Sequence, residues 1–147
     1  MHYTTEIIIN QPIDKVVKLF DDPENLKEWQ PGLLSFEHFE GEFGEPGSKM
    51  RLLYKMGKRE IEMIETLLSH NLPEEFTATY EAKNVWNKIK NRFVVVDSKT
   101  TKWISENEFR CSGFLRIMVF LFPGSFKKQT LKHMQDFKTF AERNGGS

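Results

Sequence analysis

The sequence has very little cysteine: Cys111 is the only one among 147 residues. One thiol cannot form an intramolecular disulfide, and a lone thiol in a patterned strand is typical of a reducing compartment. The N-terminus lacks the basic start and apolar run of a signal peptide, and no stretch approaches the roughly 20 apolar residues of a membrane span. The sequence therefore predicts a cytoplasmic protein with no stable membrane insertion.

An excess of charge is also missing, because 21 Lys and Arg residues balance 21 Asp and Glu residues. Nucleic-acid binders depend on a positive surface, so we expect no nucleic-acid partner. The sequence contains neither a GxSxG elbow nor a GxGxxG phosphate loop. We expect no metal and no cofactor, because the histidines are dispersed and lack metal-ligand spacing. They are His2, His38, His70 and His133.

Aromatic and methionine side chains are abundant, with thirteen Phe and six Met. Such a composition suits an ordinary core or a cavity that adapts to its guest. The length fits one domain, which we place at residues 1–144, followed by a frayed tail at 145–147.

Two short helices are predicted after a first strand at residues 3–10. Pro12 is favoured at the first helical position, and the apolar residues that follow have the i, i+3, i+4, i+7 spacing of one helical face. A second helix is expected to begin at Asp22-Pro23 and to end before Pro31-Gly32. Its apolar side carries Leu26 and Trp29.

Further along the chain, apolar and polar residues alternate with the period of strands. Turn residues at 44–47 and 57–58 and a break at Leu72-Pro73 divide this region. The predicted strands cover residues 36–43, 50–56, 60–67, 76–82, 85–96 and 100–113, with a turn inside the last one at Glu106-Asn107. Short connections favour antiparallel pairing, so we expect one sheet of about seven strands.

Residues 114–122 form the longest apolar run, broken only by Arg116. We interpret it as the end of a strand plus one or two helical turns, kinked at Pro123-Gly124. The run favours membrane docking or dimer formation slightly. Ser125 is expected to cap a terminal helix, with Leu131 at the margin of its apolar stripe. The stripe consists of Phe126, Thr130, Met134, Phe137, Phe140 and Ala141.

Several segments resemble the START-related, or SRPBCC, superfamily, which includes polyketide cyclase/dehydrase-like and birch-pollen-allergen-like proteins. They are residues 9–16 (INQPIDKV), 29–32 (WQPG), 40–41 (EG) with 46–48 (PGS), and 131–142, which is similar to the last helix of the family. The resemblance implies an α+β helix-grip fold, in which a curved seven-stranded antiparallel sheet wraps a long C-terminal helix. It also implies a hydrophobic cavity between sheet and helix, gated by the first two helices.

Polar side chains on otherwise apolar strand faces need a partner, which can be a neighbour, water or a ligand. Glu65 is the one ionisable member of this group, and burial would make it a candidate general acid or base. The facing of the strands that carry Glu65 and Trp103 is left open by the pattern. The candidate ligand-binding residues are Met50, Leu52, Tyr54, Met63, Glu65, Tyr80, Asn87, Asn91, Phe93, Met134 and Phe137.

The function expected from this set is binding or transport of an apolar or amphipathic small molecule, such as a lipid, polyketide or quinone, without catalysis. Two alternatives stay open. One is a cyclase or dehydratase that acts in the same cavity with Glu65 or a tyrosine as acid or base. The other is a protein-interaction module like the chaperone-assisting branch of the superfamily. Both a monomer and a homodimer are compatible with the sequence.

Overall fold

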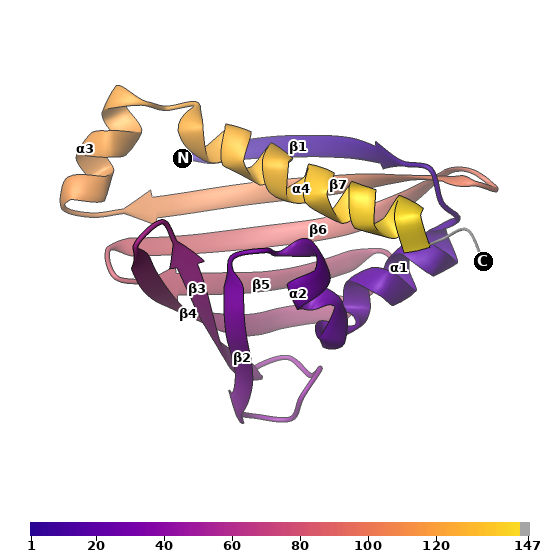
Figure 1. Ribbon diagram of the computed structural model, residues 1–147, viewed down its shortest axis with the longest axis horizontal. Coiled ribbons are helices and arrows are strands. Elements are labelled where there is room, and N and C mark those ends of the chain that lie inside the picture. The colour runs from indigo at the N-terminus through magenta and orange to yellow at the C-terminus, as the bar shows by residue number, and fades with distance from the viewer. Residues whose placement is uncertain (145–147) are drawn as a thin grey trace.

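The computed structural model describes residues 1–144; the predicted frayed tail, 145–147, lies outside the described residues. One antiparallel sheet of seven strands runs through the protein in the order β1-β7-β6-β5-β4-β3-β2 (Figure 1). Its strands are β1 (His2–Ile9), β2 (Leu33–Glu40), β3 (Lys49–Met56), β4 (Arg59–Asn71), β5 (Glu75–Ala82), β6 (Val85–Asp97) and β7 (Thr100–Cys111). Apart from the β1–β7 contact, neighbours in the sheet are neighbours in the chain.

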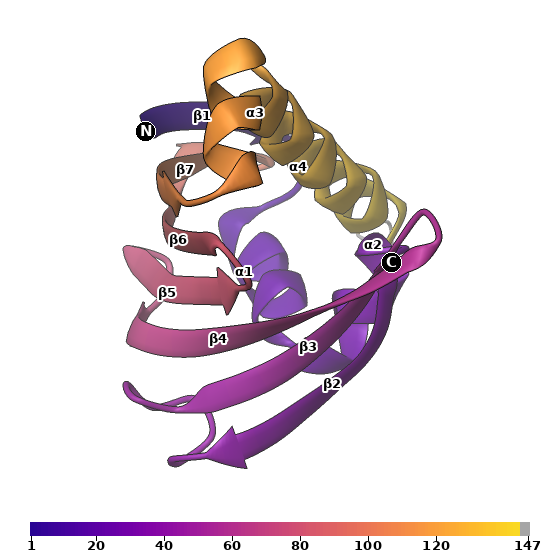
Figure 2. The same cartoon turned by 90° about the vertical axis from the view of Figure 1, so that its left-hand side faces the viewer.

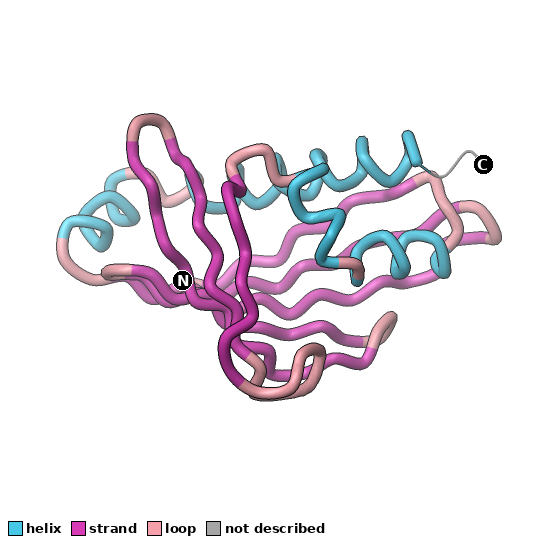
Figure 3. Tube along the Cα trace, turned by 60° about the horizontal axis from the view of Figure 1, so that its bottom comes forward, coloured by secondary structure: helices cyan, strands magenta, loops and turns pink. Residues whose placement is uncertain are grey.

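The helices are α1 (Ile13–Asp21), the 3-10 turn η1 (Pro23–Asn25), α2 (Leu26–Trp29), α3 (Phe114–Leu121) and α4 (Ser125–Asn144). The sheet is strongly curved, and α1, α2 and α4 lie on its concave side (Figure 2). Helix α4 packs chiefly along β1 and against α2, whereas α1 packs on β6 and β7. In Figure 3 the helices α1 and α2 lie on the same side of the sheet. The predicted α+β architecture is confirmed.

Several predicted boundaries were wrong in detail. The turn expected at Glu106-Asn107 does not exist, because β7 is continuous and pairs along its length with β6 and β1. The run 114–122 is not the end of a strand. Gly113 has φ +61°, a conformation that side-chain-bearing residues rarely adopt. The chain turns at this glycine, and the segment Phe114–Leu121 that follows is helical throughout.

Smaller differences concern helix ends and one strand. Pro12 is the N-cap of α1 instead of its first residue. Strand β2 begins at Leu33 and ends at Glu40, earlier than expected at both ends. The Ser125 hydroxyl donates a hydrogen bond to the Phe122 carbonyl at 2.9 Å, whereas a helix cap would accept one.

An aromatic cluster fixes the C-terminal half of α4 to one end of the sheet. Phe137 is fully buried and packs against Phe20, Trp29 and Trp103 with ring centroids 5.0 to 5.7 Å apart. Phe20 of α1 also contacts Phe93 at 5.0 Å. Trp103 therefore faces the concave side, which answers the question left open by its strand pattern. Edge-to-face aromatic pairs of this kind stabilise by about 0.5–1.5 kcal/mol each beyond their burial.

A second, smaller apolar cluster lies on the other arm of the sheet. Leu33, Met50 and Leu52 are buried there, with half-buried Met63 packed against them. Leu26 of α2 contacts both clusters. The apolar interior is thus divided into two parts, and α2 connects them.

We predict that Phe137→Ala lowers the free energy of unfolding by about 3–5 kcal/mol, because it removes a ring from the centre of the aromatic cluster. Leu131→Ala is the matched control on the same helix, since Leu131 is 39% exposed, and its cost should stay below about 1 kcal/mol. Urea denaturation measures both. Equal losses for the two variants would show that the aromatic cluster does not anchor α4.

Candidate functional site

The strand register brings four of the predicted residues into one line across the concave face. Met50 of β3 lies opposite Glu65 of β4, Glu65 lies opposite Tyr80 of β5, and Tyr80 lies opposite Asn87 of β6. Directly opposed residues in an antiparallel pair lie on the same face with Cβ atoms about 5 Å apart. These four residues are called the Glu65 row below. Their arrangement resolves the facing of β4, because Glu65 lies on the concave side with Met50.

Glu65 is the only carboxylate in this row, and its surroundings change its acidity. Burial raises its pKa, although a hydrogen bond with Tyr80 acts in the opposite direction. Burial together with the neighbouring Glu65 charge also raises the pKa of Tyr80 well above its ordinary value. Tyr80 therefore stays a phenol that donates to Glu65 at neutral pH. A carboxyl group accepts hydrogen bonds from a bound molecule when it is ionised, and it can donate one to that molecule when it is protonated.

A second tyrosine connects the sheet to the segment after α2. The Tyr54 hydroxyl donates to Oε1 of Gln30 at 2.7 Å. Burial raises the pKa of Tyr54, and the charge of Glu65 adds to this effect. Gln30 directly follows α2, so this hydrogen bond fixes the helix that connects the two apolar clusters.

Two buried polar atoms lack a hydrogen-bond partner within the described residues: Oδ1 of Asn107 and Nε1 of Trp29. Asn107 belongs to β7 and its amide nitrogen donates to Ser105 Oγ at 3.0 Å. If the amide oxygen and nitrogen of Asn107 were exchanged, the oxygen would face Ser105 and the nitrogen would lack a partner. One atom of this amide is therefore unpartnered in either orientation. Unpartnered buried polar atoms are costly, and a ligand or water that binds them removes the cost.

His133 of α4 combines exposed surface with a dry environment. Its ring packs on Trp29 with centroids 4.7 Å apart. The side chain is exposed by surface area, yet desolvation by the surrounding protein lowers its pKa to about 4. The ring contact with Trp29 places His133 where α4 packs against α2. Tyr54, Glu65 and Tyr80 show the same combination, since each keeps some accessible surface and has a pKa shifted by desolvation.

The remaining predicted residues lie elsewhere in the interior. Asn91 accepts a hydrogen bond from Trp103 Nε1 at 2.9 Å and donates to the Phe76 carbonyl at 3.3 Å, so both ends of its amide are used by the protein. Phe93, Met134 and Phe137 are buried in the aromatic cluster, at 0–3% exposure. Their role as ligand contacts stays a prediction, and the site described here does not depend on them.

Sequence reasoning missed Gln30 and His133, and it also missed the buried side chain of Asn107 on β7. Asn107 was assigned to a turn because Asn is common in turns. His133 precedes Met134 of the apolar stripe and lies four residues before Phe137, a spacing that places it beside the buried face. That spacing was the available signal for His133. Gln30 lies in the WQPG segment that carries the family resemblance, but no sequence pattern predicts a site role for it.

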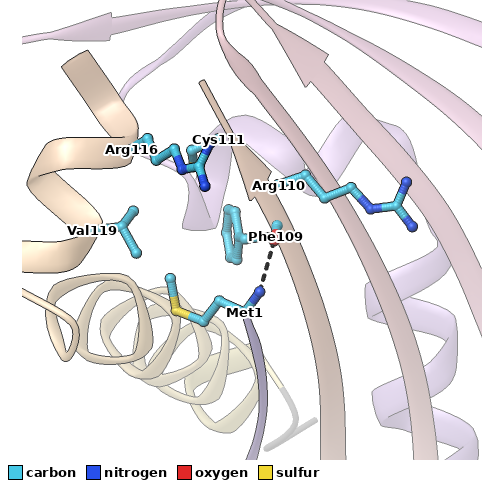
Figure 4. A pocket seen from close by; sticks show the side chains of 6 residues that line it. All are labelled: Met1, Phe109, Arg110, Cys111, Arg116 and Val119. Carbon is cyan, nitrogen blue, oxygen red and sulfur yellow. Dashed lines mark hydrogen bonds between the residues drawn. The ribbon is translucent and has the colours of Figure 1, made fainter. Parts of the chain in front are cut away.

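Within residues 1–144, no group of three or more His, Cys, Asp or Glu side chains is arranged to hold a metal ion. A cavity of about 320 Å³ lies between α3 and the end of β7 (Figure 4), and its lining residue Phe109 lies opposite Asn87 of the Glu65 row. The chemistry available at the Glu65 row is hydrogen bonding and proton exchange on an otherwise apolar surface.

Comparison with solved structures identifies the architecture. The crystal structure of Ara h 8.0201 matches 98% of this chain and 99% of its own, with a TM-score of 0.79 and 16% identity. The chain has the helix-grip fold. The Zhui aromatase/cyclase from Streptomyces sp. R1128 matches 97% of this chain and 94% of its own, with a TM-score of 0.78 and 13% identity.

A START superfamily protein from Mycobacterium smegmatis has a TM-score of 0.77 and 12% identity, over 97% of each chain. The resemblance to START-related proteins inferred from the sequence is thus confirmed at the level of the fold. No protein-family profile and no curated protein sequence matches the chain. The helix-grip fold hosts different activities, so function has to be argued from the Glu65 row itself.

We predict that Glu65→Gln raises the free energy of unfolding at pH 7 to 8, and that the gain shrinks as the pH falls. The folded-state pKa of Glu65 lies above the unfolded one, so the folded protein binds more protons in the interval between them. Stability of the unchanged protein therefore falls as the pH rises through that interval. Urea denaturation at a series of pH values measures the effect.

The matched control is Glu60→Gln, on the same strand at an exposed position. It should leave the shape of the pH profile unchanged. If Glu65→Gln and the unchanged protein have parallel profiles, the Glu65 carboxyl is not desolvated.

Proposed function

We propose that the protein binds a small apolar molecule that carries at least one hydrogen-bonding group. The molecule lies in a recess that we infer between the Glu65 row and helices α2 and α4. The observation that carries the proposal is the desolvated Glu65–Tyr80 pair on the concave face, next to the apolar Leu33, Met50 and Leu52 cluster. Ligand sites are typically of this kind, mostly apolar with a few convergent polar groups.

The two parts of the surface have different tasks. Burial of apolar ligand area contributes roughly 25 cal/mol per Å² and supplies most of the affinity. Glu65 and Tyr80 orient the ligand by hydrogen bonding to its polar group. A hydroxylated or carbonyl-bearing ligand satisfies such groups, whereas a pure hydrocarbon does not.

Two solved structures with the same fold bear on this proposal. One of the structural matches is an aromatase/cyclase and another is a START superfamily protein. At 12–13% identity, these similarities support the site only through the shared fold.

A second candidate function is acid–base catalysis in the same recess. The raised pKa of Glu65 and its hydrogen bond with Tyr80 favour it, because a desolvated carboxyl group with a raised pKa is a candidate general acid or base. An enzyme of this type would show a pH-dependent rate that Glu65→Gln abolishes. A carrier would retain binding in that variant.

We predict that the protein binds 2-naphthol about tenfold more tightly than naphthalene, since one hydrogen bond to the Glu65–Tyr80 pair is worth about 1.5 kcal/mol. Tyr80→Phe should reduce this preference, and Glu65→Met should remove it, while naphthalene binding stays within about twofold. Ligand fluorescence titration of the unchanged protein and both variants with each ligand measures the six affinities.

Met63→Trp tests the apolar part of the same recess. Met63 is half-buried beside Leu52, so a larger ring there should weaken binding of both probes at least tenfold. Met56→Trp is the matched control, since Met56 is 48% exposed at the end of the hairpin, and should leave binding unchanged. Unchanged affinity in Met63→Trp would contradict the proposed location.

A further inference from the structure

Helix α3 exposes an unusual amount of apolar surface. None of its residues is buried, and its main contact with the rest of the protein is with β7. Phe120 is 84% exposed and Phe114 is 70% exposed, and three further large apolar residues, Ile117, Leu121 and Phe122, are more than half exposed. Contiguous apolar patches of this kind mark interaction sites in soluble proteins. Figures 1 and 2 show α3 at one end of the molecule, next to the start of α4.

The charge around this patch has one sign. Residues 111–135 contain Arg116, Lys127, Lys128 and Lys132 and no Asp or Glu. Lys132 is paired with Asp136 at 2.7 Å. Arg116, Lys127 and Lys128 have no ion-pair partner within the described part of the chain, residues 1–144. The patch therefore combines exposed aromatic rings with three free cations.

A cavity beneath α3 adds a third feature. It has a volume of about 320 Å³, and the residues that line it are Met1, Phe109, Arg110, Cys111, Arg116 and Val119. In Figure 4 the Arg116 side chain extends from α3 towards Phe109, whereas Arg110 points away. The Arg116 guanidinium thus has open space before it, where an anionic group can reach it without displacing a protein partner.

We propose that α3 and the first turn of α4 form a surface that docks reversibly on membranes containing anionic phospholipids. Exposed Phe, Leu and Ile side chains enter the boundary between headgroups and acyl chains, and the free cations contact lipid phosphates. A second copy of the chain fits this surface less well, because a two-fold contact would place the same cations opposite one another. No helix within residues 1–144 is long and apolar enough to cross a bilayer, so the contact is peripheral.

Vesicle sedimentation with the full chain tests the proposal. Vesicles of phosphatidylcholine with one quarter phosphatidylglycerol should bind the protein at 0.1 M NaCl. Binding should fall on the order of tenfold on pure phosphatidylcholine, and by a similar factor at 0.5 M NaCl, because salt screens the cations.

Variants locate the contact on α3. Ile117→Ser combined with Phe120→Ser should reduce binding at least tenfold. Lys127→Glu combined with Lys128→Glu should do the same on anionic vesicles only. The matched control is Val95→Ser combined with Val96→Ser, two exposed apolar residues near the β6–β7 turn at the other end of the molecule. This control should bind as the unchanged protein does.

Three outcomes would overturn the proposal. The first is absence of vesicle binding, and the second is binding that the α3 variants do not alter. The third is a dimer in analytical ultracentrifugation that Phe120→Ser dissociates, because the surface would then be a dimer interface. The variants should bind 2-naphthol normally, because none of the four substituted residues belongs to the Glu65 row or lines the cavity beneath α3. Failure of vesicle binding is thereby distinguished from failure of the proposed ligand site.

Discussion

The aromatic packing of Phe20 and Phe137 is the interaction on which the rest of the structure depends. Phe137 brings α4 onto Trp29 and Trp103, and Phe20 brings α1 onto the same rings. Both helices are thereby held at one end of the concave face. Among the strands that carry the Glu65 row, β6 is contacted by α1, while α2 packs on the neighbouring strand β2. The apolar cluster of β2 and β3 stays separate from the main one.

This division explains how an ionisable group comes to lie on the inner face. A carboxylate placed among the aromatic rings would lack partners, at a cost of several kcal/mol. In the Glu65 row, Tyr80 donates to the carboxyl group and the surface remains partly accessible. Desolvation without complete closure shifts the acidity of Glu65, Tyr80 and His133 together. The same features that weaken this region as a core make it suitable for a ligand.

Much of the fold could be predicted from the sequence, since alternation at 50–56 and 76–82 and the stripe around Phe137 report local periodicity. Glu65 and Tyr80 were recognised as polar residues on apolar faces. Their direct opposition was not predictable, because it depends on the register between strands and on bulges such as the one between Leu67 and Ser69. Asn107 was missed because turn preference and strand pairing conflict there, and tertiary pairing prevails.

The most direct test of the account is a crystal structure of the protein with 2-naphthol bound. We predict that the naphthalene ring lies beside Met63 and Leu52, facing α2, with its hydroxyl within hydrogen-bonding distance of the Glu65 carboxyl group. A ligand found only on the outer face of the sheet, or with its hydroxyl directed away from both Glu65 and Tyr80, would contradict the account.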